Sequence, residues 1–326
     1  MDYLSSLEKR KMFNSKFNQL LFIKFPILFP LSYIFILYVF PSYEKELILV
    51  TILLLAEPHF GVTRPFFLHK TNLHYINEKK IELLIIPILI CIFSLIGFFF
   101  FRNLFFIVFF GANIYHVTRQ SFGICKIYCK NELEFRFQAK YIYLLNAFLF
   151  LIALFRFYLP IINSENLIFL NIFFLSLLSI ISFIYLFRFK FSENYLTFLT
   201  GSIIFYPVCF VDNPIHVILM GVTMHYTQYI YLTYNVHVLR KKNYYENNSQ
   251  FISNKLLNYL LVIFLYSFIM TAFSMAGKIE NIDLSQLIII PILGQMLHFY
   301  LDSQLWKFSE KHNRDNTLLY LKKFIR

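Results

Sequence analysis

Long apolar runs alternate with short polar segments along the whole chain. Residues 20–40 contain a single charged side chain, Lys24, and residues 81–101 contain only Glu82. A helix needs roughly 20 predominantly apolar residues to cross the hydrocarbon core of a bilayer. The pattern therefore predicts about ten membrane-spanning helices, over residues 20–40, 47–67, 81–101, 103–125, 141–159, 167–187, 195–211, 215–238, 256–276 and 286–306.

The predicted fold class is an all-α, polytopic integral membrane bundle that occupies residues 1–326 as a single transmembrane domain. No composition shift marks a soluble domain, and the longest polar stretch, residues 240–255, is too short to fold alone. We expect this stretch to be a cytoplasmic loop and residues 307–326 to be a cytoplasmic tail.

Composition supports a membrane location. Of the 326 residues, 58% are hydrophobic, and 43 Phe and 23 Tyr are present. The mean hydropathy of +0.60 is far above that of ordinary soluble domains. We expect a multi-pass protein of the cell (inner) membrane.

The formal charge of +12 follows the predicted topology. Among the basic residues outside the spans, only Lys45, Arg102 and Lys278 fall at the outer ends of the predicted helices. The others gather at the inner ends, as expected because Lys and Arg in short loops favour the cytoplasmic side. This distribution predicts that both termini are cytoplasmic and that the number of spans is even. It also explains the charge without nucleic acid as a partner.

Four histidines lie at one depth of the predicted bundle. The spans that carry them run in the same direction, and each histidine falls about 10–13 residues from the outer end of its span, a spread of about one helical turn. The sequence therefore predicts a shared layer of imidazoles, formed by His59, His116, His225 and His298.

Other polar residues lie within one or two turns of these histidines. A charged or strongly polar group inside the hydrocarbon region is costly, so it normally faces the bundle interior and serves a function. Residues three or four apart share a helical face, which places His116 beside Arg119 and Gln120. The candidate site residues around the imidazoles are Glu57, Tyr115, Arg119, Gln120, Gln228 and Asp302.

This combination is typical of a metal site. Neutral imidazole is a common ligand of iron, zinc and copper, and nearby amides and carboxylates orient such rings. We expect His59, His116, His225 and His298 to bind non-haem iron. The partner would be a membrane lipid or another lipophilic small molecule that reaches the site from the bilayer.

Two segments resemble a known family. Tyr115-His116-Val117-Thr118-Arg119 on one helix and Met224-His225-Tyr226 on a later one are similar to the bacterial membrane carotene dioxygenases of the bacteriorhodopsin-related-protein type. The resemblance implies an integral membrane fold, iron held by four histidines and oxidative cleavage of β-carotene to retinal. It implies His59, His116 and His225 as ligands. Tyr229 stands where that family has a second late histidine, which leaves His298 to supply the fourth ligand.

Two other classes of function fit the same residues. One is a membrane acyl- or glycosyl-transferase in which a histidine with Asp302 acts as general base and Arg119 binds an anionic group. The other is an ion- or proton-coupled transporter with a site at the membrane midplane. The dense histidine boxes of membrane desaturases are absent from the sequence.

Overall fold

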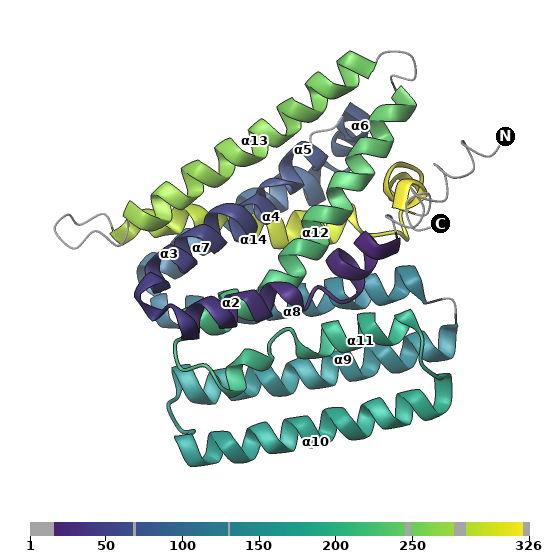
Figure 1. The fold of residues 1–326 in the computed structure, drawn as a ribbon. Helices are drawn as coiled ribbons and strands as arrows, with labels where there is room; N and C mark the ends of the chain where they lie inside the picture. Colours follow the sequence, from purple (N-terminus) through teal and green to yellow (C-terminus); the bar gives the residue numbers. More distant parts are fainter. Residues whose placement is uncertain (1–15, 68–69, 130, 245–248, 277–284, 322–326) are drawn as a thin grey trace. The chain divides into compact units, whose positions relative to one another are not determined.

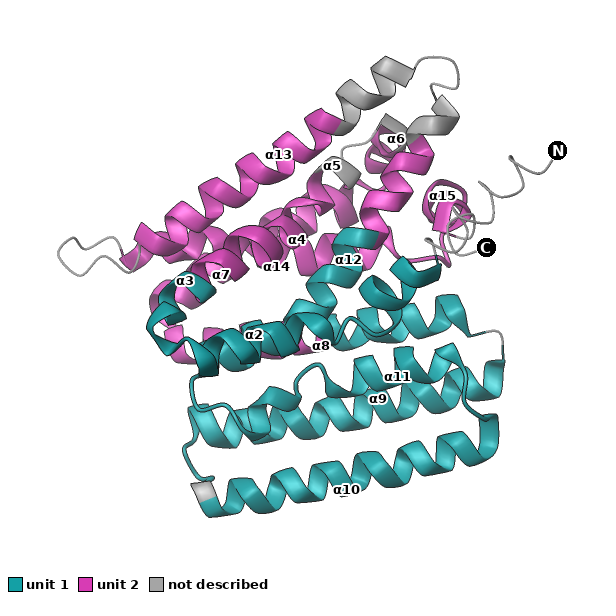
Figure 2. Ribbon diagram, in the orientation of Figure 1, with its two compact units in different colours: residues 1–47, 117–231 teal, residues 48–116, 232–326 magenta. Residues whose placement is uncertain are grey.

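The computed structural model describes residues 16–67, 70–129, 131–244, 249–276 and 285–321. Within these residues the protein is all-helical and contains no strand, which confirms the predicted fold class at that level. The chain divides into two compact units, each built from two separate segments (Figure 2). Unit 1 comprises Met1–Leu47 and Val117–Tyr231, and unit 2 comprises Ile48–His116 and Leu232–Arg326.

Three helices, which are labelled in Figure 1, contain the boundaries between the units. They are α3 (Glu44–Thr51), α8 (Arg102–Tyr128) and α12 (Pro214–Tyr244). The remaining elements of unit 1 are η1 (Leu20–Lys24), α2 (Leu28–Val39), η2 (Pro41–Tyr43), α9 (Glu132–Ala153), η5 (Leu154–Tyr158), α10 (Ser164–Phe189), α11 (Glu193–Ile203) and η6 (Tyr206–Cys209).

Within unit 1, α9 packs between α10 and α11 (Figure 1). Asn131 begins α9 as its N-cap, and its side chain accepts hydrogen bonds from the backbone N–H groups of Leu133 and Glu134. Further along α9, the Asn146 amide donates to the Gly201 carbonyl of α11 at 2.8 Å. A polar side chain thus ties two apolar helices together in the buried part of this unit.

Unit 2 carries the elements that matter most for function. Its remaining elements are η3 (Ile52–Ala56), α4 (Glu57–Gly61), α5 (Thr63–Phe67), α6 (Lys70–Glu78), η4 (Ile81–Ile85), α7 (Ile86–Phe100), α13 (Ser249–Ala276), η7 (Ser285–Ile288), α14 (Ile289–Leu305), α15 (Lys311–Asn313) and η8 (Arg314–Leu318). Helix α13 packs along α4, and α14 packs along α7.

Four helices among the described residues are long and apolar enough to cross a membrane. They cover Ile81–Phe100, Glu132–Tyr158, Glu165–Phe189 and Leu257–Ala276. A fifth candidate is the pair Lys16–Lys24 and Leu28–Val39, which is bent by 57°. Pro26 lies at this bend, where its missing N–H interrupts helical hydrogen bonding.

The other five predicted spans are also largely helical, but they are less apolar. These segments contain α3 to α5, α8, α11 with η6, α12 and α14, and none of them passes as a membrane span by length and composition. They include the four helices on which His59, His116, His225 and His298 lie. The polar residues that suggest a site therefore lower the hydropathy of the helices that carry them.

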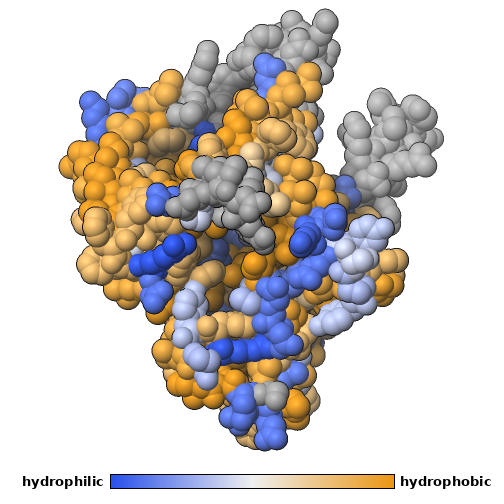
Figure 3. Space-filling model, turned by 90° about the vertical axis from the view of Figure 1, so that its left-hand side faces the viewer, coloured by the Kyte–Doolittle hydropathy of each residue, from blue (hydrophilic) through white to orange (hydrophobic). Residues whose placement is uncertain are grey.

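Exposed apolar side chains cover the candidate spans. On α10, Phe183 and Phe187 are 70% and 83% exposed, and Phe268 of α13 is 66% exposed. Hydrophobic residues also cover much of the face in Figure 3. Such surface is costly in water but stable against lipid acyl chains.

Part of the predicted loop over residues 240–255 is helical in the structure. Helix α12 continues to Tyr244 and α13 begins at Ser249, while residues 245–248 lie outside the described part. The buried Arg240 donates through Nε to the Asn316 carbonyl at 2.6 Å and through Nη2 to Thr317 Oγ1 at 2.8 Å. The guanidinium of Arg240 thus anchors η8 to the end of α12.

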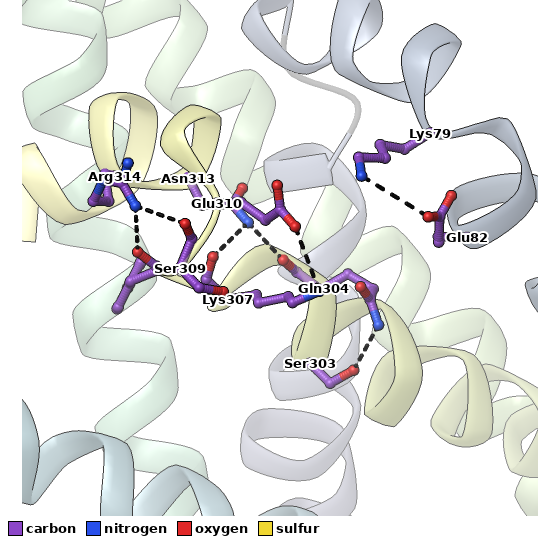
Figure 4. A network of polar contacts seen from close by, with 10 residues as sticks. Lys79, Glu82, Ser303, Gln304, Lys307, Ser309, Glu310, Asn313 and Arg314 are labelled. Carbon is purple, nitrogen blue, oxygen red and sulfur yellow. Dashed lines mark hydrogen bonds and ion pairs between the residues drawn. The ribbon is translucent and has the colours of Figure 1, made fainter.

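Polar contacts also terminate α14 (Figure 4). The Asn313 amide donates to the carbonyls of Gln304 and Lys307 at 2.7 and 3.2 Å, so it satisfies carbonyl groups at and just after the end of the helix. In the same segment the His312 ring stacks on Tyr75 of α6 and bonds to Asn72 at 2.8 Å. Burial is the largest cause that lowers the pKa of His312, and the nearby charge of Arg240 lowers it further.

Candidate metal centre

Three of the four predicted histidines meet inside unit 2. His59 of α4, His116 of α8 and His298 of α14 are at most 6% exposed, and each offers a ring nitrogen within 4.8 Å of the others. His298 Nε2 lies 3.2 Å from His116 Nε2, and the ring centroids of His59 and His298 are 4.5 Å apart. These residues form a buried three-histidine group that could hold a metal ion.

The nitrogen separations can be compared with those of a filled site. Two imidazoles that bind one metal at about 2.0–2.1 Å in tetrahedral geometry have nitrogens about 3.3–3.4 Å apart. The 3.2 Å between His116 and His298 is close to that separation. The limit of 4.8 Å, within which all three ring nitrogens lie, is about 1.5 Å longer than the separation in a filled site. The 3.2 Å separation of His116 and His298 fits two ligands of one metal and also fits a hydrogen bond between the two imidazoles, and the nitrogen offered by His59 lies within 4.8 Å of both.

Thr63 holds one ring of the group in place. Its Oγ1 lies 2.7 Å from His298 Nδ1, and both residues are buried. Because Nδ1 is engaged with Thr63, the other nitrogen of the ring, Nε2, faces His116. A hydrogen-bonded Nδ1 with Nε2 directed to a common point is the arrangement by which proteins orient metal-binding histidines.

Aromatic rings enclose the imidazoles. The Phe60 ring lies 5.2 Å from His298 and the Phe299 ring 4.8 Å from His116, centroid to centroid. Phe299 also packs against a buried apolar cluster that contains Phe109 and Ile292. The three imidazoles therefore lie in apolar, aromatic surroundings.

Local sequence explains how α4 positions His59. Pro58 has no N–H with which to bond the carbonyl four residues earlier, and the preceding turn, Ile52–Ala56, is a π-helix in which Glu57 N–H donates to Ile52 O. Such π turns change the register of a helix and occur often at functional sites. The turn therefore sets the direction in which Glu57 and His59 project.

The polar residues near His59 form a second group on the same helices. The Arg64 guanidinium lies 4.3 Å from the centre of the Tyr266 ring, and the Gln295 side chain hydrogen-bonds to the Glu57 carboxyl. Glu57 and Arg64 are seven residues apart in the chain, a spacing that puts two helical residues on one face, but no such pattern marks Tyr266. In a chain with 23 Tyr, a single tyrosine carries no signal.

Asp302, which lies four residues after His298, is buried and bound to a tryptophan. Its Oδ1 accepts a hydrogen bond from Trp306 Nε1 at 2.6 Å. His298, Asp302 and Trp306 follow one another at intervals of four residues, and the carboxylate–indole contact joins the last two.

The residues of α8 that the sequence placed on one face differ in their exposure. His116 is buried, whereas Tyr115 and Arg119 are exposed and Gln120 is partly exposed. Arg119 lies four residues after Tyr115 and so shares its outer face. For this reason we leave Tyr115 and Arg119 outside the centre proposed below.

His225 and Gln228 belong to unit 1. His225 is buried beside the rings of Tyr226 and Tyr229, whose centroids lie 6.1 and 6.5 Å away. Gln228 donates to the Ile23 carbonyl at 2.5 Å within the same unit. The role of His225 as a fourth ligand stays a prediction.

Comparison of the chain with protein-family models, with curated proteins and with solved structures finds no match.

Proposed function

We propose that this protein is a membrane-embedded, metal-dependent oxygenase whose metal is held by His59, His116 and His298. The observation that carries the proposal is the convergence of three buried imidazoles from three helices on one small volume. Imidazoles that converge from separate helices can share one transition-metal ion as ligands.

The donor set favours a first-row transition metal. All three ligands are imidazoles, which suit iron, zinc and copper, and the group contains no thiolate. We propose that the metal is non-haem iron. This choice agrees with the resemblance to membrane carotene dioxygenases, which implies His59 and His116 as ligands. Iron bound there would supply one-electron and dioxygen chemistry.

The protein's own residues perform three tasks in this proposal. His59, His116 and His298 bind the ion as neutral imidazoles, and Thr63 fixes the ring of His298. The rings of Phe60 and Phe299 exclude water and surround the reacting part of a lipophilic substrate. We propose that such a substrate enters from the lipid, because exposed apolar side chains dominate the candidate spans.

We test the proposal first by metal analysis of the detergent-purified protein. About one iron per chain is expected, because the three ligands define a single centre. Elemental analysis by mass spectrometry provides the measurement, and a visible spectrum distinguishes non-haem iron from haem. Protein that binds no transition metal, even after reconstitution with Fe²⁺ under anaerobic conditions, would favour the transferase or transporter instead.

We also propose that the protein crosses the inner membrane ten times with both termini in the cytoplasm. The support is the helical structure of the predicted spans together with the gathering of basic residues at alternate ends. Single cysteines introduced at Glu165 and Asn247 are then expected to react with a membrane-impermeant maleimide from opposite sides, in a background without the four native cysteines. Labelling of both positions from one side would contradict this threading.

A further inference from the structure

Two polar atoms near the histidine group are buried without a partner. Among the described residues, Glu57 Oε2 and Tyr266 Oη have no hydrogen-bond partner. Glu57 is 1% exposed and Tyr266 is 9% exposed. A buried polar atom that is left unsatisfied is costly to the fold. Two such atoms within one cluster point to a ligand that satisfies both.

Two glycines form a slot that fixes the Tyr266 ring. A Cβ at Gly61 of α4 would lie 2.7 Å from Tyr266 Cδ1, and a Cβ at Gly294 of α14 would lie 2.7 Å from Tyr266 Oη. Only glycine permits this approach at either position. Ser267, the next residue of α13, donates to the Leu53 carbonyl and fixes α13 against η3. The phenol is therefore held between the helices of His59 and His298.

The slot places the phenol oxygen beside Gly294, one turn before His298 on α14, and beside a cation. Gly294 lies four residues, or one helical turn of about 6 Å, before His298 on the same face of α14. The Arg64 Nη2 atom would be 3.6 Å from a Cβ at Gly294, so the guanidinium and the phenol oxygen meet at this point. Arg64 also lies over the Tyr266 ring, and a cation over a phenol strengthens its O–H as a donor.

The unsatisfied groups have complementary roles. The Tyr266 O–H is a donor, and the Glu57 carboxylate oxygen is an acceptor. One chemical group that accepts from the first and donates to the second is a hydroxyl. Ethers, esters and hydrocarbons lack the donor.

We infer that Glu57 and Tyr266 form a subsite for the hydroxyl group of the substrate, which is then a lipophilic alcohol with a long-chain or isoprenoid tail. Arg64 and Gln295 act as positioning residues, since one contacts the Tyr266 ring and the other bonds to the Glu57 carboxyl. This inference rests on the proposed function and narrows its substrate class.

The test measures binding of tritiated hexadecan-1-ol to the full chain in phosphatidylcholine nanodiscs by scintillation proximity. Unlabelled hexadecan-1-ol is expected to compete at least ten times better than hexadecyl methyl ether, which keeps the acceptor oxygen and lacks the donor. Tyr266→Phe and Glu57→Met are each expected to weaken alcohol binding about tenfold, because each variant removes one buried hydrogen bond to the hydroxyl.

Tyr259→Phe is the matched control. Tyr259 lies two turns before Tyr266 on α13 and is also buried. Its ring stacks on that of His237, with 3.9 Å between the ring centroids, and it contacts none of the subsite residues named above. Removing its hydroxyl is expected to leave alcohol binding unchanged. If Tyr266→Phe does not fold, the comparison of alcohol and ether binding to the unaltered protein decides whether the subsite prefers a hydroxyl group.

Equal competition by alcohol and ether would overturn the inference, as would full alcohol binding by Tyr266→Phe, and water would then be the occupant of the subsite. Iron is measured in the same preparations. Iron without hydroxyl preference refutes the subsite alone, whereas hydroxyl preference without any metal refutes the proposed oxygenase and leaves an alcohol-binding site.

Discussion

Replacing His298 by alanine is expected to weaken iron binding by at least about 100-fold. Loss of a residue that only orients a metal ligand typically costs 10- to 100-fold in affinity, so loss of the ligand itself should cost at least the upper end of that range. His298 is the central ring of the group, since it contacts both His59 and His116. Metal content after dialysis against a graded series of chelator concentrations measures the change.

Graded variants separate a ligand from a structural histidine. Thr63→Val keeps the shape of Thr63 and removes its hydrogen bond to His298, so a 10- to 100-fold loss is expected. Exogenous imidazole should restore metal to His298→Ala, because it supplies the missing nitrogen.

His216→Gln is the control for a buried histidine outside the centre. The His216 ring bonds to Tyr33 and to Glu44 at 2.7 Å each within unit 1. Metal content is expected to stay unchanged in this variant. Unchanged metal in His298→Ala, or an equal loss in His216→Gln, would contradict the three-histidine centre.

Replacing Gly221 by alanine is expected to destabilise unit 1 by more than about 3 kcal/mol, beyond the usual cost of overpacking. A Cβ at Gly221 of α12 would lie 1.8 Å from the Ile204 carbonyl oxygen at the end of α11. A backbone carbonyl cannot turn away as a flexible side chain can, so the two segments have to separate. Close approach at small residues is a general means of packing helices in membranes.

Gly123→Ala provides the matched control on α8. No atom lies within 4 Å of a Cβ at Gly123, so the substitution is expected to stabilise the helix by about 0.5–1 kcal/mol. Thermal unfolding of both variants, followed by fluorescence-detected size exclusion in detergent, gives the comparison. A Gly221→Ala protein as stable as Gly123→Ala would show that α12 and the end of α11 do not meet at this glycine.

The contrast between apolar and polar helices explains why hydropathy gave an incomplete description. Ile81–Phe100 and Glu165–Phe189 are easily recognised because nearly every position can face lipid or an apolar neighbour. Helices α8 and α14 bury histidines, amides and carboxylates instead, which lowers their hydropathy. The prediction of further spans rests on the charge distribution, because basic residues gather at alternate ends of the predicted crossings.

The sequence by itself determined the all-helical architecture and the apolar segments, and it predicted a common depth for the histidines. Each of these follows from one-dimensional information, namely the length of an apolar run and the rise of about 1.5 Å per residue along a helix. Depth alone brought His59, His116 and His298 to one level, and the structure confirms that they meet.

Only the tertiary structure decided which side chains at that depth face one another. The helical period relates residues on one helix but leaves the rotation of each helix about its axis free, and packing fixes that rotation. Because of this packing, Arg119 is exposed while His116 is buried. His225 lies in a different unit from His59, His116 and His298. It also inserted Tyr266 between Gly61 and Gly294, a contact that joins three helices through residues with no distinguishing pattern in the chain.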